Sequence, residues 1–277
     1  MTQEAVRARI DVALGEVERR EGVRVLLAVE SGSRAWGFAS RDSDYDVRFL
    51  FVRPLSEYLA ISPPPDVIER PFEDELDLGG WDLRKALGLM VRSNAVVLEW
   101  LASPVVYRQD IALLAALGAM ARAGAHLPAL AYHYDRMARS ALAGAVDGTI
   151  GLKACFYALR PVLALLWMRE HASPPPMHME ALLVGVPVLG EVREAIEALQ
   201  LRKASGTEAD TVACPPILGA FLTTVLALRA PRPGTWDREE ARATADTLFR
   251  QVVLVGNVGK CPDRSPTLQG KALEIGS

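Results

Sequence analysis

Apolar residues recur at helical spacing at the start of the chain. The intervals between them are four, four and three residues, which places them on one face of a helix. This stripe consists of Val6, Ile10, Leu14 and Val17. We therefore expect a helix over residues 2–20, and Gly22 is of the residue type that commonly follows the end of one.

Two short segments that follow have the pattern of strands. Residues 23–29 form a continuous run rich in valine and leucine, which is typical of a buried strand. Residues 45–52 alternate in part between apolar and polar positions, which predicts a second strand. A polar loop over residues 40–44 precedes it. The N-terminal part of the chain therefore carries the beginnings of a sheet.

A third strand is expected over residues 73–78, where apolar and acidic residues are mixed. Gly79 and Gly80 follow directly, and a glycine pair weakens a strand, so we expect the strand to end there. Residues 81–91 then have the composition of a helix.

Beyond about residue 94, strand-like runs become few and alanine and leucine dominate. The expected helices lie at residues 110–122, 128–145, 150–171, 189–201, 213–229 and 237–254. The predicted fold class is thus an α/β (α+β) domain with a small mixed sheet, followed by an all-helical domain. The expected division is residues 1–110, residues 111–255 and a loose tail over residues 256–277.

Composition narrows the class of protein only modestly. Half of the 277 residues are hydrophobic and 23% are charged, with a formal net charge of −3, so the chain as a whole does not attract nucleic acid, although a local basic patch stays possible. Three cysteines, Cys155, Cys214 and Cys261, have no zinc-site spacing and are expected to be reduced thiols of a cytoplasmic protein. No signal core or membrane span is expected.

The turn after the first predicted strand has the features of an anion-binding site. Ser31, Gly32 and Ser33 follow the buried run, and a short helix is expected to open there. Backbone N–H groups at such a helix start have no partner and suit a phosphate. Ser33 adds a hydroxyl donor, and Arg34 adds a charge with bidentate geometry for phosphate.

Ten residues lie between Ser33 and Asp44, and Asp44 and Asp46 are separated by a single residue. In a strand, residues two apart project from the same face, so the two carboxylates lie side by side. Their repulsion is relieved by a hard divalent cation such as Mg²⁺, or by Mn²⁺. A pair of this kind alone is weak evidence, but the order of buried strand, Gly-Ser turn and carboxylate pair is typical of metal-assisted phosphoryl or nucleotidyl transfer.

These residues carry a resemblance to a known family. Gly32-Ser33 followed after ten residues by Asp44 and Asp46 resembles the signature of the DNA polymerase beta superfamily of nucleotidyltransferases. The segments GSRAWG, SDYDVR and GWDLRKAL resemble, more narrowly, a bacterial family of predicted nucleotidyltransferases associated with RNA repair ligases. The clear resemblance covers about residues 29–104, and weaker similarity continues further along the chain.

The resemblance implies a third carboxylate on a neighbouring strand. Asp77 fits this position because apolar residues flank it on the predicted third strand. Asp82 is the alternative, although an acid there also suits the start of the following helix. Glu73 and Glu75 are lesser candidates. Asp44, Asp46 and Asp77 are thus the expected metal-binding and catalytic residues.

Several basic and aromatic residues have two interpretations each. Arg48 shares a strand face with Asp46, so it either pairs with an aspartate or contacts phosphate. Trp36 either packs under the loop or stacks on a base. Arg84 and Lys85 open the helix after the third strand and either reach substrate or stay solvated.

Lys153, Tyr157 and Arg160 share one face of an otherwise apolar helix, which suggests a polar stripe facing a cleft or a partner. The resemblance implies that a helical domain closes the nucleotide cleft. Lys153 would then hold the triphosphate and Tyr157 would contact base or sugar. Snorkelling and core packing are the alternatives. A second cluster with a possible nucleic-acid role consists of Tyr132, His133, Tyr134, Arg136 and Arg139.

The expected reaction is attack of an acceptor hydroxyl on the α-phosphorus of an NTP, with two Mg²⁺ or Mn²⁺ ions and release of pyrophosphate. Gly32, Ser33, Arg34 and Arg48 join Lys153 and Tyr157 as expected nucleotide-binding residues. The family association favours an RNA end, such as tRNA, as acceptor, and an RNA ligase as partner. A protein or small-molecule acceptor, and a silent nucleotide-binding partner of ligases, stay open as alternatives.

Overall fold

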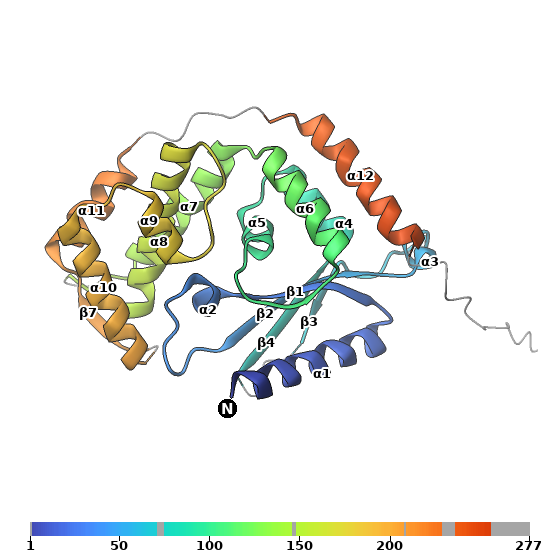
Figure 1. Ribbon diagram of the computed structural model, residues 1–277, viewed down its shortest axis with the longest axis horizontal. Helices are drawn as coiled ribbons and strands as arrows, with labels where there is room; N and C mark the ends of the chain where they lie inside the picture. The colour runs from blue at the N-terminus through green and yellow to red at the C-terminus, as the bar shows by residue number, and fades with distance from the viewer. Residues whose placement is uncertain (1, 71–74, 146–147, 208, 229–235, 256–277) are drawn as a thin grey trace, which may run out of the picture.

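The computed structural model describes residues 2–70, 75–145, 148–207, 209–228 and 236–255. The expected tail, Glu73 and Cys261 lie outside them. The centre is a five-stranded mixed sheet with strand order β3-β4-β2-β1-β5 (Figure 1). Its β2–β4 pairing is parallel, and the others are antiparallel. The strands are β1 (Arg24–Ser31), β2 (Tyr45–Val52), β3 (Val67–Glu69), β4 (Leu76–Asp82) and β5 (Val106–Gln109).

Helix α1 (Gln3–Glu21) covers one face of the sheet. Its four predicted stripe residues are all buried, and they pack against valine and phenylalanine side chains of β1 and β2. Gly22 caps the helix in the left-handed conformation, as the sequence predicted. The period of this stripe was therefore sufficient to place α1 and its buried face.

The opposite face carries four helices, which lie above the sheet in Figure 1. Their apolar residues share one core with Leu26, Leu50 and Val52 of the sheet. The last helix of the described chain packs against the first of these four, so the C-terminal segment returns to the sheet. The four helices are α4 (Leu83–Val91), α5 (Ala95–Leu101), α6 (Ile111–Ala123) and α12 (Arg238–Val255).

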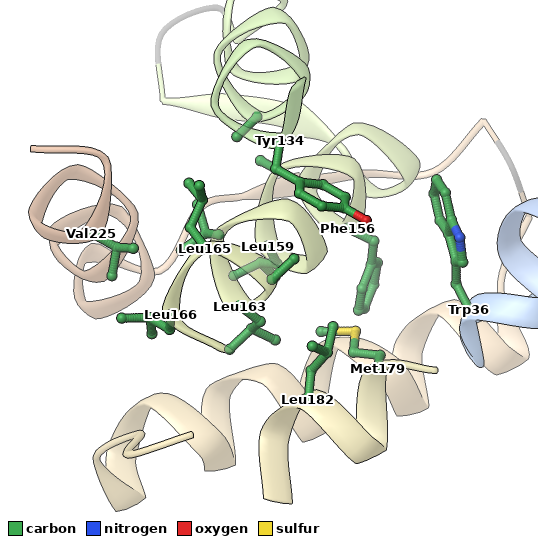
Figure 2. Packing of buried hydrophobic residues seen from close by; sticks show 14 of the residues in the cluster. Trp36, Tyr134, Phe156, Leu159, Leu163, Leu165, Leu166, Met179, Leu182 and Val225 are labelled. Atoms are coloured by element: carbon green, nitrogen blue, oxygen red, sulfur yellow. The ribbon is translucent and has the colours of Figure 1, made fainter. Parts of the chain in front are cut away.

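A separate helical group forms a second, larger core beside the sheet (Figure 2). Buried helix α8 is at its centre, and Trp36 from the β1–α2 region packs into it. The group consists of α7 (Leu127–Leu142), α8 (Leu152–His171), α9 (Met179–Gly185), α10 (Gly190–Ser205) and α11 (Pro216–Leu226). The remaining short helices are α2 (Gly32–Trp36) and α3 (Leu55–Tyr58).

Two predictions about the strands were wrong. The third strand does not end at Gly79 and Gly80 but runs through them to Asp82. Phe49 lies opposite Gly80, and a Cβ at Gly80 would come within 2.2 Å of the Phe49 ring, so the glycine makes room for that ring. The helical region also contains a two-stranded sheet, β6 (Thr149–Gly151) with β7 (Thr211–Ala213), so it is not all-helical.

The polar stripe predicted on α8 does not hold at Arg160. This side chain is completely buried, and its Nη1 donates to Glu99 Oε1 at 2.7 Å. Tyr134 donates to the same oxygen at 2.9 Å, so α5, α7 and α8 are joined by one buried network. Because Arg160 has a carboxylate partner inside the protein, its position on α8 does not indicate a cleft or a partner surface.

Among the described residues, no single helix is long and apolar enough to cross a membrane. Only across a 96° bend do α6 and α7 together reach that length and composition.

Candidate active site

The β1–α2 turn brings its backbone against a carboxylate. β1 ends at Ser31, two residues beyond the predicted strand, and α2 begins at Gly32, where the sequence predicted that a short helix opens. Gly32 has a φ of 64°, and a Cβ there would lie 2.2 Å from Asp46 Oδ2. A side chain at this position is therefore excluded both by backbone conformation and by contact. Ser33, the next residue of the turn, is buried.

The carboxylates of Asp46 and Asp77 belong to adjacent strands. They are register partners in the parallel pair β2–β4. Phe49 and Phe51 face α1, whereas Leu50 and Val52 face the α4 side, so alternation puts Asp46 on the α4 side as well. The sequence predicted Asp77 on a strand beside the Asp44–Asp46 strand. In the structure Asp77 lies directly opposite Asp46 on that neighbouring strand.

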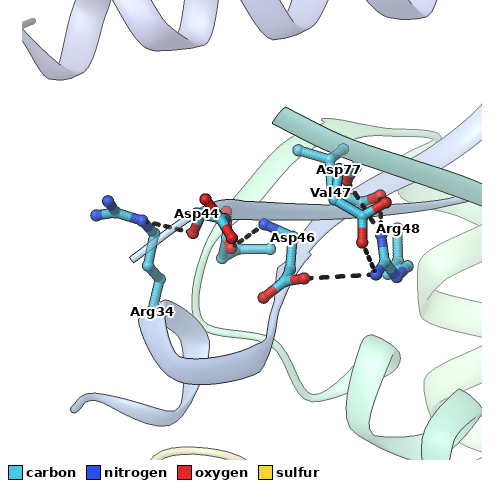
Figure 3. A network of polar contacts seen from close by, with 7 residues as sticks. Arg34, Asp44, Asp46, Val47, Arg48 and Asp77 are labelled. Carbon is cyan, nitrogen blue, oxygen red and sulfur yellow. Dashed lines mark hydrogen bonds and ion pairs between the residues drawn. The ribbon is translucent and has the colours of Figure 1, made fainter. Parts of the chain in front are cut away.

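Arg48 lies between these two carboxylates (Figure 3). Its Nη2 is 2.6 Å from Asp77 Oδ2 and 3.4 Å from Asp46 Oδ1. Its Nη1 also donates to the carbonyl oxygen of Asp77. Of the two roles open to Arg48 in the sequence, the structure shows the ion pair with the aspartates.

The Asp46 carboxyl lies in a field of mixed charge. Partial burial raises its pKa above the usual value of 3.8, and the negative charges of Asp77 and Asp44 add to that rise. The positive charges of Arg48 and Lys153 oppose it. Lys153 from α8 therefore lies within electrostatic range of Asp46, and its contact with a triphosphate stays a prediction.

Arg34 holds the loop that carries the carboxylates. Its Nε donates to the carbonyl oxygen of Asp44 at 3.0 Å, and it also donates to the carbonyl oxygen of Ser43. Its guanidinium carbon lies 3.9 Å from the centre of the Tyr45 ring. Arg34, which was predicted to bind phosphate, thus holds the backbone of the loop that carries the exposed Asp44.

Glu30 is a residue of the site that the sequence reasoning missed. It is completely buried on β1, and its Oε1 accepts from the backbone N–H of Asp46 at 2.8 Å. Tyr107 donates its hydroxyl proton to the other oxygen. Burial raises the pKa of Glu30 to about 7. The available signal was a carboxylate at the end of an apolar run, directly before the Gly-Ser turn.

The start of α8 adds to the rim of the site. The ring of Tyr157 meets that of Trp36 edge-on, with centroids 4.9 Å apart. Gly37 lies against His178, so close that a Cβ would reach 2.3 Å from its ring nitrogen. Trp36 is buried in these contacts, which is the packing role considered for it. The α2 turn is consequently held by the helical group as well as by the sheet.

Asp82 has a structural role at the other end of β4. It caps α4, because its side chain accepts from the backbone N–H of Arg84 at 2.8 Å. Tyr58 donates to its second oxygen at 2.8 Å. Asp82 is five residues beyond Asp77 on the same strand, away from Asp46. The geometry therefore favours Asp77 over Asp82 as the partner of Asp46.

The donor set suits a hard divalent cation. Asp44, Asp46 and Asp77 offer carboxylate oxygens, and the turn at Gly32 leaves the space in front of Asp46 free of any side chain of its own. Within the described ranges, no three His, Cys, Asp or Glu side chains already stand together as a metal-binding group. The positive charge that offsets Asp46 and Asp77 in this structure comes from Arg48.

The basic and aromatic cluster predicted on α7 is not one surface. Tyr134 is buried and bonded to Glu99, whereas Tyr132 is exposed. Arg136 lies over Tyr132, and Arg139 pairs with Asp135 one turn earlier. Tyr132, Arg136 and Arg139 follow at spacings of four and three residues and share the exposed face of α7, so a nucleic-acid role stays a prediction for these three, and the buried Tyr134 is excluded from it.

A helical turn at the end of β1, with carboxylates at β2 and β4, the next two strands of the sheet, is the arrangement expected of a nucleotidyltransferase. The family described as RlaP, RNA repair pathway DNA polymerase beta family, matches residues 6–251. The chain belongs to this family, as the sequence motifs indicated. It is also 40% identical over 220 residues to the "Uncharacterized protein YcgL" of Bacillus subtilis (strain 168), covering 79% of this chain and 85% of that protein. No solved structure matches it.

Proposed function

We propose that this protein transfers a nucleoside monophosphate from an NTP to an acceptor hydroxyl at an RNA end, with release of pyrophosphate. The observation that carries the proposal is the placement of Asp46 and Asp77 in register on adjacent strands, with Asp44 two residues before Asp46. Family membership supports the same class of reaction in an RNA repair pathway.

Asp44, Asp46 and Asp77 are the residues that would hold Mg²⁺ or Mn²⁺, which would supply charge neutralisation for the triphosphate and for the attacking oxygen. Asp77 accepts the proton of the attacking hydroxyl in this proposal. Before it can do so, its carboxylate must leave Arg48, whose guanidinium then becomes available to phosphate oxygens.

The remaining residues orient the nucleotide. Ser33 and the N–H groups of the β1–α2 turn bind the β and γ phosphates, and Arg34 keeps the Asp44 loop in place. Lys153 contributes charge to the triphosphate from α8, and Tyr157 contacts the base or the sugar. The acceptor approaches from the open side of the carboxylates.

A transfer assay tests the proposal. The protein is incubated with Mg²⁺ or Mn²⁺, each α-labelled NTP and separate acceptors: bulk tRNA, nicked RNA, DNA, total protein, or none. The double variant Asp44→Asn/Asp46→Asn runs beside it, with Glu194→Gln/Glu197→Gln as a matched control that removes two exposed charges from α10. We expect label on RNA from the wild type and the control, and none from the aspartate variant.

Other outcomes would redirect the assignment. Label on protein or on a small molecule would keep the chemistry and remove the RNA acceptor. NTP binding without label on any acceptor would favour a nucleotide-binding partner of repair ligases. Transfer that survives in the Asp44→Asn/Asp46→Asn variant would refute the site itself.

A further inference from the structure

A groove of about 800 Å³ lies between α4 and α12, and positive charge dominates its walls. Arg84 and Arg92 line it from α4, and Arg238 and Arg242 line it from α12. Two carboxylates, those of Glu239 and Asp246, also face it. The groove is thus basic on balance, although the whole chain has a net charge of −3.

The groove is distinctive because four arginines without a carboxylate partner among the described residues line one cavity. In the described part of the chain, no ion pair joins Arg84, Arg92, Arg238 or Arg242 to an acid. Arg108 and Arg139, by contrast, are both paired with aspartates. Unpaired guanidinium groups gathered around one groove keep their full donor capacity for an anionic ligand.

The floor of the groove is apolar. Leu87 from α4 and Ala245 from α12 line it and are buried, and Phe249 from α12 is partly buried beside them. A free phosphate ion has no apolar part that could contact such a floor. Single-stranded nucleic acid, in contrast, presents phosphates along one side and flat apolar bases along the other. The combination of basic rim and apolar floor therefore fits a single strand.

The two sides of α12 differ in charge. On its other side, toward α6, a second groove of about 580 Å³ is lined by Asp237, Glu239 and Glu240, with Arg238 as its one basic residue. An anionic strand would be repelled there. The α4 side is consequently the side of α12 on which such a strand can lie.

The groove lies on the same face of the sheet as the candidate catalytic carboxylates. α4 follows directly on β4 and packs on the face to which Asp46 and Asp77 project. Asp82, which caps α4, is five residues along β4 from Asp77, or about 17 Å at strand spacing. A strand held in the groove thus contacts the protein well away from the site of transfer.

We propose that the α4–α12 groove binds the sugar-phosphate backbone of single-stranded RNA, as a docking site for the acceptor remote from its reacting end. This inference deepens the proposed function and rests on its choice of RNA. It implies that acceptors too short to reach the groove are bound more weakly than long ones.

The test is RNA binding by Arg92→Gln/Arg242→Gln. Arg19→Gln/Arg20→Gln removes the same charge from the exposed side of α1 and is the matched control. Fluorescence anisotropy with a labelled single-stranded RNA of about 30 nucleotides, in a salt series, gives the affinity and its salt dependence. Two lost phosphate contacts should lower the slope of log K against log salt by about 1.4, at 0.7 for each contact.

We expect the groove variant to bind long RNA at least tenfold more weakly, with the α1 control like the wild type. An unchanged affinity and slope in the groove variant, or an equal loss in the control, overturns the proposal. Inorganic phosphate or duplex RNA that competes as well as single strands also overturns it.

Binding separates this inference from the proposed function. The Asp44→Asn/Asp46→Asn variant should bind RNA normally without transferring a nucleotide. RNA binding that depends on Arg92 and Arg242 in a protein without transfer activity would leave the groove standing and remove the reaction. Transfer to RNA by a protein whose RNA binding does not depend on Arg92 and Arg242 would support the reaction and remove the groove as a binding site.

Discussion

Gly32 gives the β1–α2 turn its close approach to Asp46, and its substitution tests that contact. Gly32→Ala would place a Cβ 2.2 Å from Asp46 Oδ2 at a φ of 64°, so we expect Asp46 to be displaced and nucleotidyl transfer to be lost. Gly22→Ala is the matched control, because Gly22 has a φ of 65° and no atom within 4 Å.

Both variants should lose about 1–2 kcal/mol of stability from the left-handed backbone, measured by denaturant unfolding. Only Gly32→Ala should lose activity. Equal activity of the two variants would show that the approach to Asp46 does not matter for the site.

Glu30 makes the stability of the protein depend on pH. Its pKa is raised from 4.5 to about 7 in the folded protein, so the folded state binds a proton more tightly than the unfolded state does. The contribution of Glu30 to the free energy of unfolding is therefore largest below about pH 4.5, and it falls by on the order of 3 kcal/mol as the pH rises through about 7.

Glu30→Gln should remove this contribution, since a neutral amide cannot ionise. We expect the stability of the wild type relative to Glu30→Gln to fall between pH 4.5 and 7, measured by urea unfolding in EDTA so that bound metal does not contribute. Parallel pH profiles of the two proteins would contradict the raised pKa.

At the scale of single residues, the sequence was informative where a motif has a fixed spacing. The Gly32 turn and the Asp44–Asp46 pair were predicted from their spacing, whereas Asp77 was predicted from the family resemblance together with its apolar neighbours, and the catalytic roles of these residues stay predictions. Glu30 could not be assigned, because its role depends on Tyr107, which is 77 positions away in the chain. Arg160 was misjudged for the same reason, since its partner Glu99 lies on another helix.

Between elements, the buried pair Arg160–Glu99 links α8 to α5. Glu99→Ala should cost about 3–5 kcal/mol, because it leaves the fully buried Arg160 charge without a carboxylate. The double variant Glu99→Leu/Arg160→Met should cost less than the sum of the single changes, since both charges are then gone. Thermal or urea unfolding of Glu99→Ala, Glu99→Leu, Arg160→Met and the double variant gives these values, and additive costs would show that the pair is not coupled.

Secondary structure followed from periodicity where an element buries one clear face. Helix α1 and strand β2 were predicted within a residue or two of their observed bounds. Short elements such as β3, β5, α5 and α9 were missed, because three to seven residues carry too little periodicity. β4 was cut short at its glycines because the ring of Phe49 that they accommodate comes from a neighbouring strand.

Over the whole molecule, the packing does not follow the order of the chain. α2 lies between the first two strands in sequence, yet Trp36 belongs to the core of the helical group. α12 follows that group in sequence, yet packs on α4 beside the sheet. The sequence predicted a sheet part and a helical part, but not these exchanges, because they depend on contacts between distant segments.

This arrangement makes a specific prediction about nucleotide binding. Lys153 is in electrostatic range of Asp46, and Tyr157 packs on Trp36, so α2 and the start of α8 border one site. A nonhydrolysable NTP with Mg²⁺ should therefore slow hydrogen exchange both in the β1–α2 turn and at the start of α8, while α1, on the other face of the sheet, stays unchanged. Protection confined to the β1–α2 turn would exclude Lys153 and Tyr157 from the nucleotide site. Equal protection in Asp44→Asn/Asp46→Asn would mean that the nucleotide binds without the carboxylates.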